Sequence, residues 1–211
     1  MARKPNPDPY QCPFTVVIDS NEGSPFGFQG LTADADAGYA DKDKTPRRLI
    51  VPTKFMSLGR VQNSVGDYSI LGYADRIGVE RKSMEDVWAT VLGWGSSNDS
   101  QATGLCRRER FKQQLANMAT LDGALVVVEA TLATCLQNIP EWGDRGADHN
   151  RKIFHRSVLS MMLDFHIPWL FCDSRRLAEI VTFRYLERFW RKQQDHERML
   201  ASAEEYGVAD Q

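Results

Sequence analysis

The sequence predicts an α/β fold in which a central mixed β-sheet is flanked by helices. Short apolar runs rich in β-branched residues, such as "FTVVID" (14–19) and "GALVVVEA" (123–130), alternate with longer amphipathic segments. No Gly-rich phosphate-binding motif follows these runs, which argues against a dinucleotide-binding sheet. The 211 residues carry a net charge of −2, so the length suits one domain and the bulk charge does not indicate a nucleic-acid partner.

The elements of the N-terminal half follow from apolar runs and turn residues. Residues 1–13 contain four prolines and predict an extended arm, and residues 14–19 predict the first buried strand. A stretch rich in Gly, Asp and Ala at about 24–47 predicts a partly mobile excursion from the domain. Strands are then expected at 67–71 and 76–82, joined by a tight turn of Gly, Tyr, Ala and Asp.

Helices and strands alternate in the C-terminal half. Ser83 and Asp86 form a capping-box-like pair, which predicts a helix that ends at Gly93. Apolar periodicity predicts further helices at 105–120, 150–166 and 174–194 and strands at 123–130 and 167–172. The chain is polar from Asp195, so residues 193–211 are expected to form a tail that frays.

One charged strand carries the chemistry that the sequence predicts. Residues i and i+2 of a strand point to the same side, so Glu80 and Lys82 project together while Arg81 faces the other way. Asp67 begins the paired strand and can lie beside them. Two carboxylates and an amine are the minimal set for metal-assisted phosphodiester hydrolysis, because Mg²⁺ prefers oxygen ligands and lysine is a compact point charge.

A wider pattern resembles the XPF-type structure-specific endonuclease family, whose signature is GD…ERKxxxD preceded by an Asp-x-x-Glu. The matching segments are "IDSNE" (18–22), "GDY" (66–68) and "VERKSMED" (79–86). In "RRERFKQQL", Arg110 and Gln114 match the family's Arg-Phe-x-x-Gln segment. The resemblance covers roughly residues 14–190. It departs at Asn21, where the family usually has arginine.

The resemblance implies a restriction-endonuclease-like core and a Mg²⁺- or Mn²⁺-dependent endodeoxyribonuclease acting on branched or flapped DNA, in repair or recombination. The nuclease domain would span residues 14–192, with no helix-hairpin-helix module expected after Gln194. The implied metal ligands are Asp19, Asp67 and Glu80. The implied catalytic residues are Glu22, Asp67, Glu80, Arg81, Lys82 and Asp86. Two alternatives stay open, a catalytically silent module that binds DNA junctions and a less selective recombination nuclease.

Several of these residues also have structural interpretations. Asp86 can cap the helix with Ser83, serve the site, or do both. Arg81 can pair with a nearby acid or reach a DNA phosphate. Glu22 can be a first-turn helix acid, although the nearby Asp19 favours the site. Glu129 ends a buried strand, where functional acids and surface acids are equally common.

Two further predictions concern partners. The basic residues of "CRRERFKQQL" (106–115) are either a solvated helix face or contacts to DNA phosphates, and the second interpretation is favoured. The predicted DNA-binding residues are Arg107, Arg108, Arg110, Lys112 and Gln114. The sequence has neither a signal peptide nor an apolar run of roughly 18 residues, so a soluble cytoplasmic protein without a membrane partner is expected.

The last helix predicts a homodimer. One apolar face, expected to pack on the core, consists of Leu177, Ile180, Val181 and Tyr185. A second face would need another partner, which would be a second copy of the chain or the helix at 150–165. This second face consists of Phe183, Leu186 and Trp190.

Overall fold

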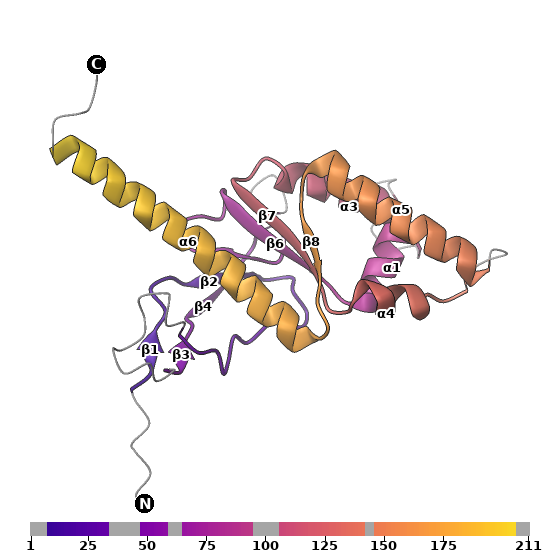
Figure 1. Ribbon diagram of the computed structural model, residues 1–211, viewed down its shortest axis with the longest axis horizontal. Helices are drawn as coiled ribbons and strands as arrows, with labels where there is room; N and C mark the ends of the chain where they lie inside the picture. Colours follow the sequence, from indigo (N-terminus) through magenta and orange to yellow (C-terminus); the bar gives the residue numbers. More distant parts are fainter. Residues whose placement is uncertain (1–7, 34–46, 59–64, 95–105, 142–145, 206–211) are drawn as a thin grey trace, which may run out of the picture.

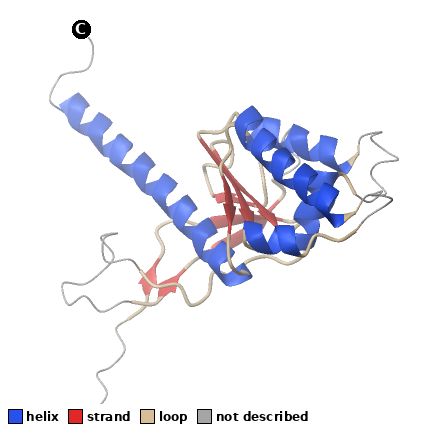
Figure 2. Cartoon of the chain, turned by 45° about the vertical axis from the view of Figure 1, so that its right-hand side comes forward, coloured by secondary structure: helices blue, strands red, loops and turns tan. Residues whose placement is uncertain are grey.

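The computed structural model describes residues 8–33, 47–58, 65–94, 106–141 and 146–205. It confirms the predicted α/β class: a six-stranded mixed sheet lies between one long helix and a group of four helices (Figures 1 and 2). The strands are β1 (Tyr10–Gln11), β2 (Val16–Asp19), β3 (Leu49–Ile50), β4 (Thr53–Met56), β5 (Tyr68–Ile70), β6 (Ile77–Lys82), β7 (Gly123–Val128) and β8 (Trp169–Phe171). The helices are α1 (Met84–Leu92), α3 (Arg107–Met118), α4 (Leu132–Gln137), α5 (Ala147–Phe165) and α6 (Arg175–Glu205).

The large sheet has the order β4-β2-β5-β6-β7-β8. Strand β5 runs antiparallel to β2 and β6, whereas the β2–β4, β6–β7 and β7–β8 pairs are parallel. The carboxyl ends of β6, β7 and β8 therefore meet at one edge of the sheet, and this edge receives the charged residues of β6.

Both faces of the central strands are buried. Leu125 and Val127 of β7 pack on the side of α6, whereas Val126 and Val128 pack on the side of α1, α3 and α5. This alternation follows from the two-residue period of a strand. In the β6–β7 register Arg81 pairs with Val127, so its side chain lies on the α6 side. Glu80 and Lys82 pair with Val126 and Val128, so their side chains lie on the other side.

The N-terminal segment is more ordered than predicted. Strand β1 lies within the expected arm, where it pairs in parallel with β3. Within the expected excursion, Phe26, Phe28 and Leu31 are buried in the core on the α6 side, and Phe26 stacks on Tyr68 with 5.0 Å between ring centroids. Composition was misleading here because three large apolar side chains outweigh the surrounding Gly and Asp. The remainder, 34–46, lies outside the described residues.

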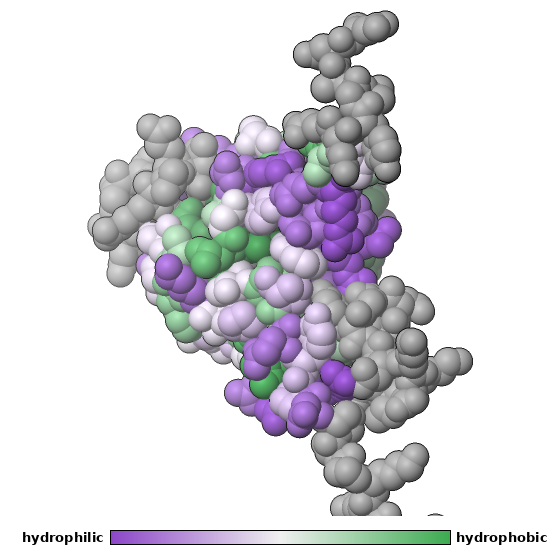
Figure 3. Space-filling model, turned by 90° about the vertical axis from the view of Figure 1, so that its left-hand side faces the viewer, coloured by the Kyte–Doolittle hydropathy of each residue, from purple (hydrophilic) through white to green (hydrophobic). Residues whose placement is uncertain are grey.

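Helix α6 is longer than predicted. It continues to Glu205, so the expected frayed tail is wrong for residues 195–205. These residues include three Glu and two Ala together with Arg198, Met199 and Leu200, all of which favour helix even without packing. This half of α6 projects from the body in Figure 1, and in Figure 3 hydrophilic residues gather on the side where the helix ends. The short helix α4 was not predicted.

The second apolar face of α6 does not exist as a free surface. Phe183 and Leu186 are fully buried, and Phe14 stacks on Phe183 with ring centroids 5.8 Å apart. Phe14 also lies against Trp190, with ring centroids 5.7 Å apart, so this face packs on the N-terminal segment of the same chain. Leu177, which was expected to face the core, is 40% exposed.

Within the described residues, no helix combines the length and the apolar character that crossing a membrane requires.

Candidate active site

Strand β6 divides the charged motif between the two faces of the sheet, as the alternation predicted. Glu80 and Lys82 lie on the α3 side, where the Lys82 Nζ atom is 2.7 Å from Glu80 Oε1. Arg81 faces the other way and contacts two carboxylates. The carboxylate of Glu80 is almost fully buried, with 3% of its side chain exposed. A carboxylate in this position needs polar partners, since burying a bare charge is costly.

Two glycines bring Asp67 against β6. A Cβ atom on Gly78 would lie 1.8 Å from the carbonyl oxygen of Val65, and one on Gly66 would lie 2.7 Å from the backbone of Val79. Gly66 also has a positive φ of 102°, which L side chains rarely adopt. The close approach allows the backbone N–H of Arg81 to donate to Asp67 Oδ2 at 2.7 Å. The glycine of the "GDY" segment thus has a direct physical role.

The surroundings of Asp67 disfavour its charged form. Burial raises the pKa of the Asp67 carboxyl well above its usual range, and the negative charge of Glu80 raises it further. Lys82 acts in the opposite direction without cancelling these effects. Both oxygens of Glu80 already accept hydrogen bonds, one from Lys82 and the other from Gln114 Nε2 at 2.6 Å. Gln114 was predicted as a DNA contact, but here it orients Glu80.

Lys82 is held as a cation. Burial opposes its charge, but the neighbouring Glu80, Asp86 and Asp67 outweigh burial and raise the pKa of the ammonium above its ordinary value. Its Nζ atom lies 3.2 Å from Asp86 Oδ2 and 4.9 Å from the ring centroid of Phe111. Lys82 therefore keeps its proton and its positive charge at neutral pH.

Asp86 makes the contacts of both predicted roles. Its backbone N–H donates to Ser83 Oγ at 3.1 Å, which caps α1. Its carboxylate contacts Lys82 and Arg107. The same residue thus ties the first turn of α1 to the charged end of β6 and to the start of α3.

Asp19 ends β2 and Glu22 follows it, and both lie close to Asp67. The backbone N–H of Asp19 donates to the Asp67 carbonyl, but the Asp19 carboxylate accepts from the backbone and the side chain of Asn21. The Glu22 Oε1 atom accepts from Ser24 N and from Arg81 Nη1 at 3.0 Å. Asn21, at the departure from the family pattern, thus serves to hold Asp19.

The predicted basic stripe of α3 occupies two faces of the helix. Arg107 and Arg110 line a pocket of about 200 Å³, and its other lining residues are Lys82, Thr90, Phe111 and Gln114. Arg108 points elsewhere and donates to Ser157 Oγ of α5 at 3.0 Å. Lys112 does not line the pocket either. The spacing of i, i+3 and i+7 places Arg107, Arg110 and Gln114 together, and the prediction of one stripe overlooked this periodicity.

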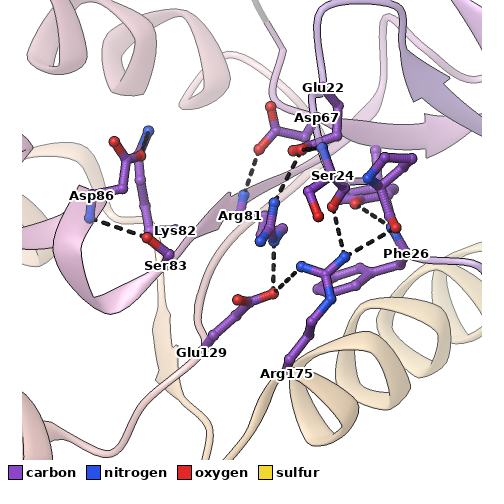
Figure 4. Close-up of polar contacts among 12 residues, drawn as sticks. Glu22, Ser24, Phe26, Asp67, Arg81, Lys82, Ser83, Asp86, Glu129 and Arg175 are labelled. Carbon is purple, nitrogen blue, oxygen red and sulfur yellow. Dashed lines mark hydrogen bonds and ion pairs between the residues drawn. The ribbon is translucent and has the colours of Figure 1, made fainter.

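The structure adds a charged network that the sequence did not predict. Glu129, just after β7, accepts from Arg81 and from Arg175 at the start of α6 (Figure 4). Its position at a strand end was the one available signal. Nothing in the sequence distinguished Arg175, because its partners are 46 or more residues away.

The carboxylates of the α3 side fit a hard divalent cation. Among the residues that the structure describes, no three His, Cys, Asp or Glu side chains form a metal-binding group. Mg²⁺, however, is commonly held by one or two carboxylates together with waters and substrate phosphate. Asp67 and Glu80 supply such a pair, and burial together with the charge of Glu80 raises the pKa of Asp67, a cost that a bound cation would relieve.

A scan of protein-family models finds no match to this chain, and a search of curated proteins finds none either. The chain is similar in structure to XPF from Aeropyrum pernix, with a TM-score of 0.44 and 17% sequence identity. This similarity covers 88% of the chain and 69% of that protein. The complex of XPF from Aeropyrum pernix with DNA is similar with a TM-score of 0.46 and 18% identity, over 85% of this chain and 66% of the other.

Proposed function

We propose that this protein is a Mg²⁺- or Mn²⁺-dependent DNA endonuclease that hydrolyses phosphodiester bonds in branched or flapped DNA, in repair or recombination. One observation carries the proposal. Asp67, Glu80 and Lys82 meet on the α3 side of β6, where the ammonium contacts Glu80 at 2.7 Å and Glu80 raises the pKa of Asp67. The "ERK" and "GD" segments supply all three residues.

The proposed reaction is attack of a water oxygen on phosphorus, with cleavage of the bond to the leaving oxygen, which takes a proton. Asp67 and Glu80 would hold the metal ion, which when bound lowers the pKa of a coordinated water and polarises the phosphoryl oxygen. Lys82 stays protonated, so it donates hydrogen bonds and stabilises developing negative charge. Gln114 and Lys82 together fix the orientation of Glu80.

The proposed DNA contact is the pocket beside Lys82. Arg107 and Arg110 place two guanidinium groups near the catalytic carboxylates, and guanidinium binds phosphate well. A backbone phosphate bound here would lie next to Glu80. Arg108 and Lys112, on the other side of α3, would contribute less to DNA affinity.

The decisive experiment uses labelled single-stranded, duplex, flap and four-way DNAs with Mg²⁺ or Mn²⁺. Cleavage of flap or four-way DNA by the wild-type protein, and its loss in Glu80→Gln, would support the proposal. Glu85→Gln is the matched control, because Glu85 is an exposed acid in the first turn of α1. Binding without cleavage would indicate the silent junction-binding module, and equal cleavage of all DNAs would indicate the less selective nuclease.

The homodimer through α6 stays a prediction, and the face on which it was based is buried. Of the residues assigned to the two apolar faces of α6, Leu177 is an exposed large hydrophobic residue. Light scattering on purified protein should report a mass near twice 23.9 kDa if two copies associate. Leu177→Asp should then halve that mass without unfolding the chain, and a wild-type monomer at tens of micromolar would contradict the prediction.

A further inference from the structure

Glu129 joins two arginines that come from different elements. Its Oε1 atom accepts from Arg81 Nε at 2.7 Å and from Arg175 Nη1 at 2.8 Å (Figure 4). The Glu129 side chain is 11% exposed, so both contacts are made with little water present. Charge-assisted hydrogen bonds of this kind are short and directional, and they fix the geometry of both guanidinium groups.

Arg175 also holds the segment that follows β2. Its Nη2 atom donates to the carbonyl oxygens of Ser24 at 2.6 Å and Pro25 at 3.0 Å. The guanidinium carbon of Arg175 lies 5.0 Å from the ring centroid of Phe26, and that of Arg81 lies 5.5 Å from the same ring. The two arginines therefore share an aromatic contact as well as a carboxylate.

Arg81 connects this network to the proposed catalytic carboxylate. Its Nη1 atom donates to Glu22 Oε1, and its backbone N–H donates to Asp67 Oδ2. The backbone of Arg81 is thus a direct partner of Asp67, while its side chain is held by Glu22 and Glu129. If Arg81 shifts, its backbone N–H shifts too, and the hydrogen bond to Asp67 Oδ2 changes even though residue 67 is not substituted.

We propose that Glu129 and Arg175 are positioning residues that act through Arg81 to fix Asp67 and Glu22 for catalysis. The inference rests on the proposed nuclease function and extends it to the α6 side of the sheet. Loss of the Glu129 charge leaves Arg81 with Glu22 as its carboxylate partner, and loss of Arg175 frees the Ser24 and Pro25 carbonyls. Misplacement of reacting groups by about 1 Å can cost up to about 10²-fold in rate.

The test compares Glu129→Gln and Arg175→Ala with the control Arg176→Ala. Arg176 is the next residue of α6, and it pairs with Glu179 outside the network. Cleavage of a flap DNA should show kcat about tenfold lower in both variants, with KM within about twofold of wild type, because positioning acts on the transition state. Arg176→Ala should leave both constants unchanged, and Arg175→Lys should restore part of kcat.

A double variant separates positioning from simple loss of stability. If Arg175 acts through Glu129, then Glu129→Gln with Arg175→Ala should be no slower than Glu129→Gln alone. Multiplicative losses in the double variant would overturn the inference, as would an unchanged kcat in Arg175→Ala. Equal losses in Arg176→Ala would overturn it too, since the effect would then belong to the helix and not to the network.

A second readout does not depend on activity. The ¹⁵N NMR signals of the Arg81 Nε–H and backbone N–H should move in Glu129→Gln and Arg175→Ala but not in Arg176→Ala. Unmoved signals would overturn the inference even if kcat fell. An inactive wild-type protein would overturn the proposed function and the catalytic part of the inference together, and the Arg81 signals would show whether the network exists.

Discussion

The two faces of β6 differ in how their charges balance. On the α6 side, Arg81 and Arg175 contact Glu22 and Glu129, so two cations match two carboxylates. The pKa of Arg81 is raised above its ordinary value: burial opposes the charge, but Glu129 and Glu22 outweigh burial. This face is therefore electrostatically satisfied.

The α3 side is not satisfied in the same way. Lys82 contacts Glu80 and Asp86, and Arg107 contacts Asp86, whereas no side-chain ion pair holds Asp67 among the described contacts. Burial, and after it the charge of Glu80, raise the pKa of Asp67. The α6 side, where the charges are paired, stabilises the fold and positions its residues. The α3 side, where the charged form of Asp67 is disfavoured, is suited to bind a cation.

The largest expected effect comes from substitutions on the α3 side. Asp67→Asn, Glu80→Gln and Lys82→Ala should each lower the cleavage rate by at least about 10²-fold, because these groups serve the transition state. DNA binding should largely survive. Rates under saturating Mg²⁺ and filter-binding affinities measure the two quantities. Comparable activity in purified Glu80→Gln protein would refute the assignment.

Removing Arg81 from the α6 side should also reduce stability. Arg81→Ala leaves Glu22 and Glu129 largely buried and with fewer cationic partners, which should lower the free energy of unfolding by about 2 kcal/mol. Urea denaturation followed by circular dichroism measures this change. Arg76→Ala is a control from an exposed ion pair with Asp122, which should change stability by less than about 1 kcal/mol. An equal loss in both variants would show that the buried network adds no more stability than an exposed ion pair.

The two faces of α3 predict a smaller effect on DNA binding. Arg110→Ala should weaken binding to all DNAs alike and flatten the slope of log K against log salt by about 1. Lys112→Ala should change the slope less, because Lys112 does not line the pocket. Fluorescence anisotropy at several salt concentrations measures both slopes. Identical slopes for the two variants would support the sequence-based prediction that Arg110 and Lys112 belong to one DNA-binding stripe.

The smallest expected effect concerns the destabilisation that the charged Asp67 carboxylate causes in the folded protein. Asp67→Asn should raise the melting temperature at neutral pH by about 2 °C or more, since it removes a buried charge beside Glu80. The folded-state pKa of Asp67 lies above its unfolded value, so the folded protein binds more protons and stability falls as pH rises through that window. The advantage of Asp67→Asn should therefore shrink towards pH 4. Calorimetry at pH 4 and pH 7.5 tests this, and an advantage that grows on acidification would contradict it.

Much of the candidate site was predictable because it depends on local geometry. The opposite orientations of Lys82 and Arg81 follow from the strand period, and the cap at Ser83 follows from residues three positions apart. Of the two interpretations of Arg81, the structure shows the pairing with nearby acids, which are Glu22 and Glu129.

The sequence by itself determined the strands β2 and β5 to β8, the helices α1, α3, α5 and α6, and the side of β6 on which each charge lies, because each depends on a few neighbouring residues. The tertiary structure alone decided that Glu129 meets Arg175 and that Phe183 packs on Phe14. Those contacts join segments that are distant along the chain. Which of several apolar or charged residues meet is settled by how the whole core packs, and no local pattern contains that information.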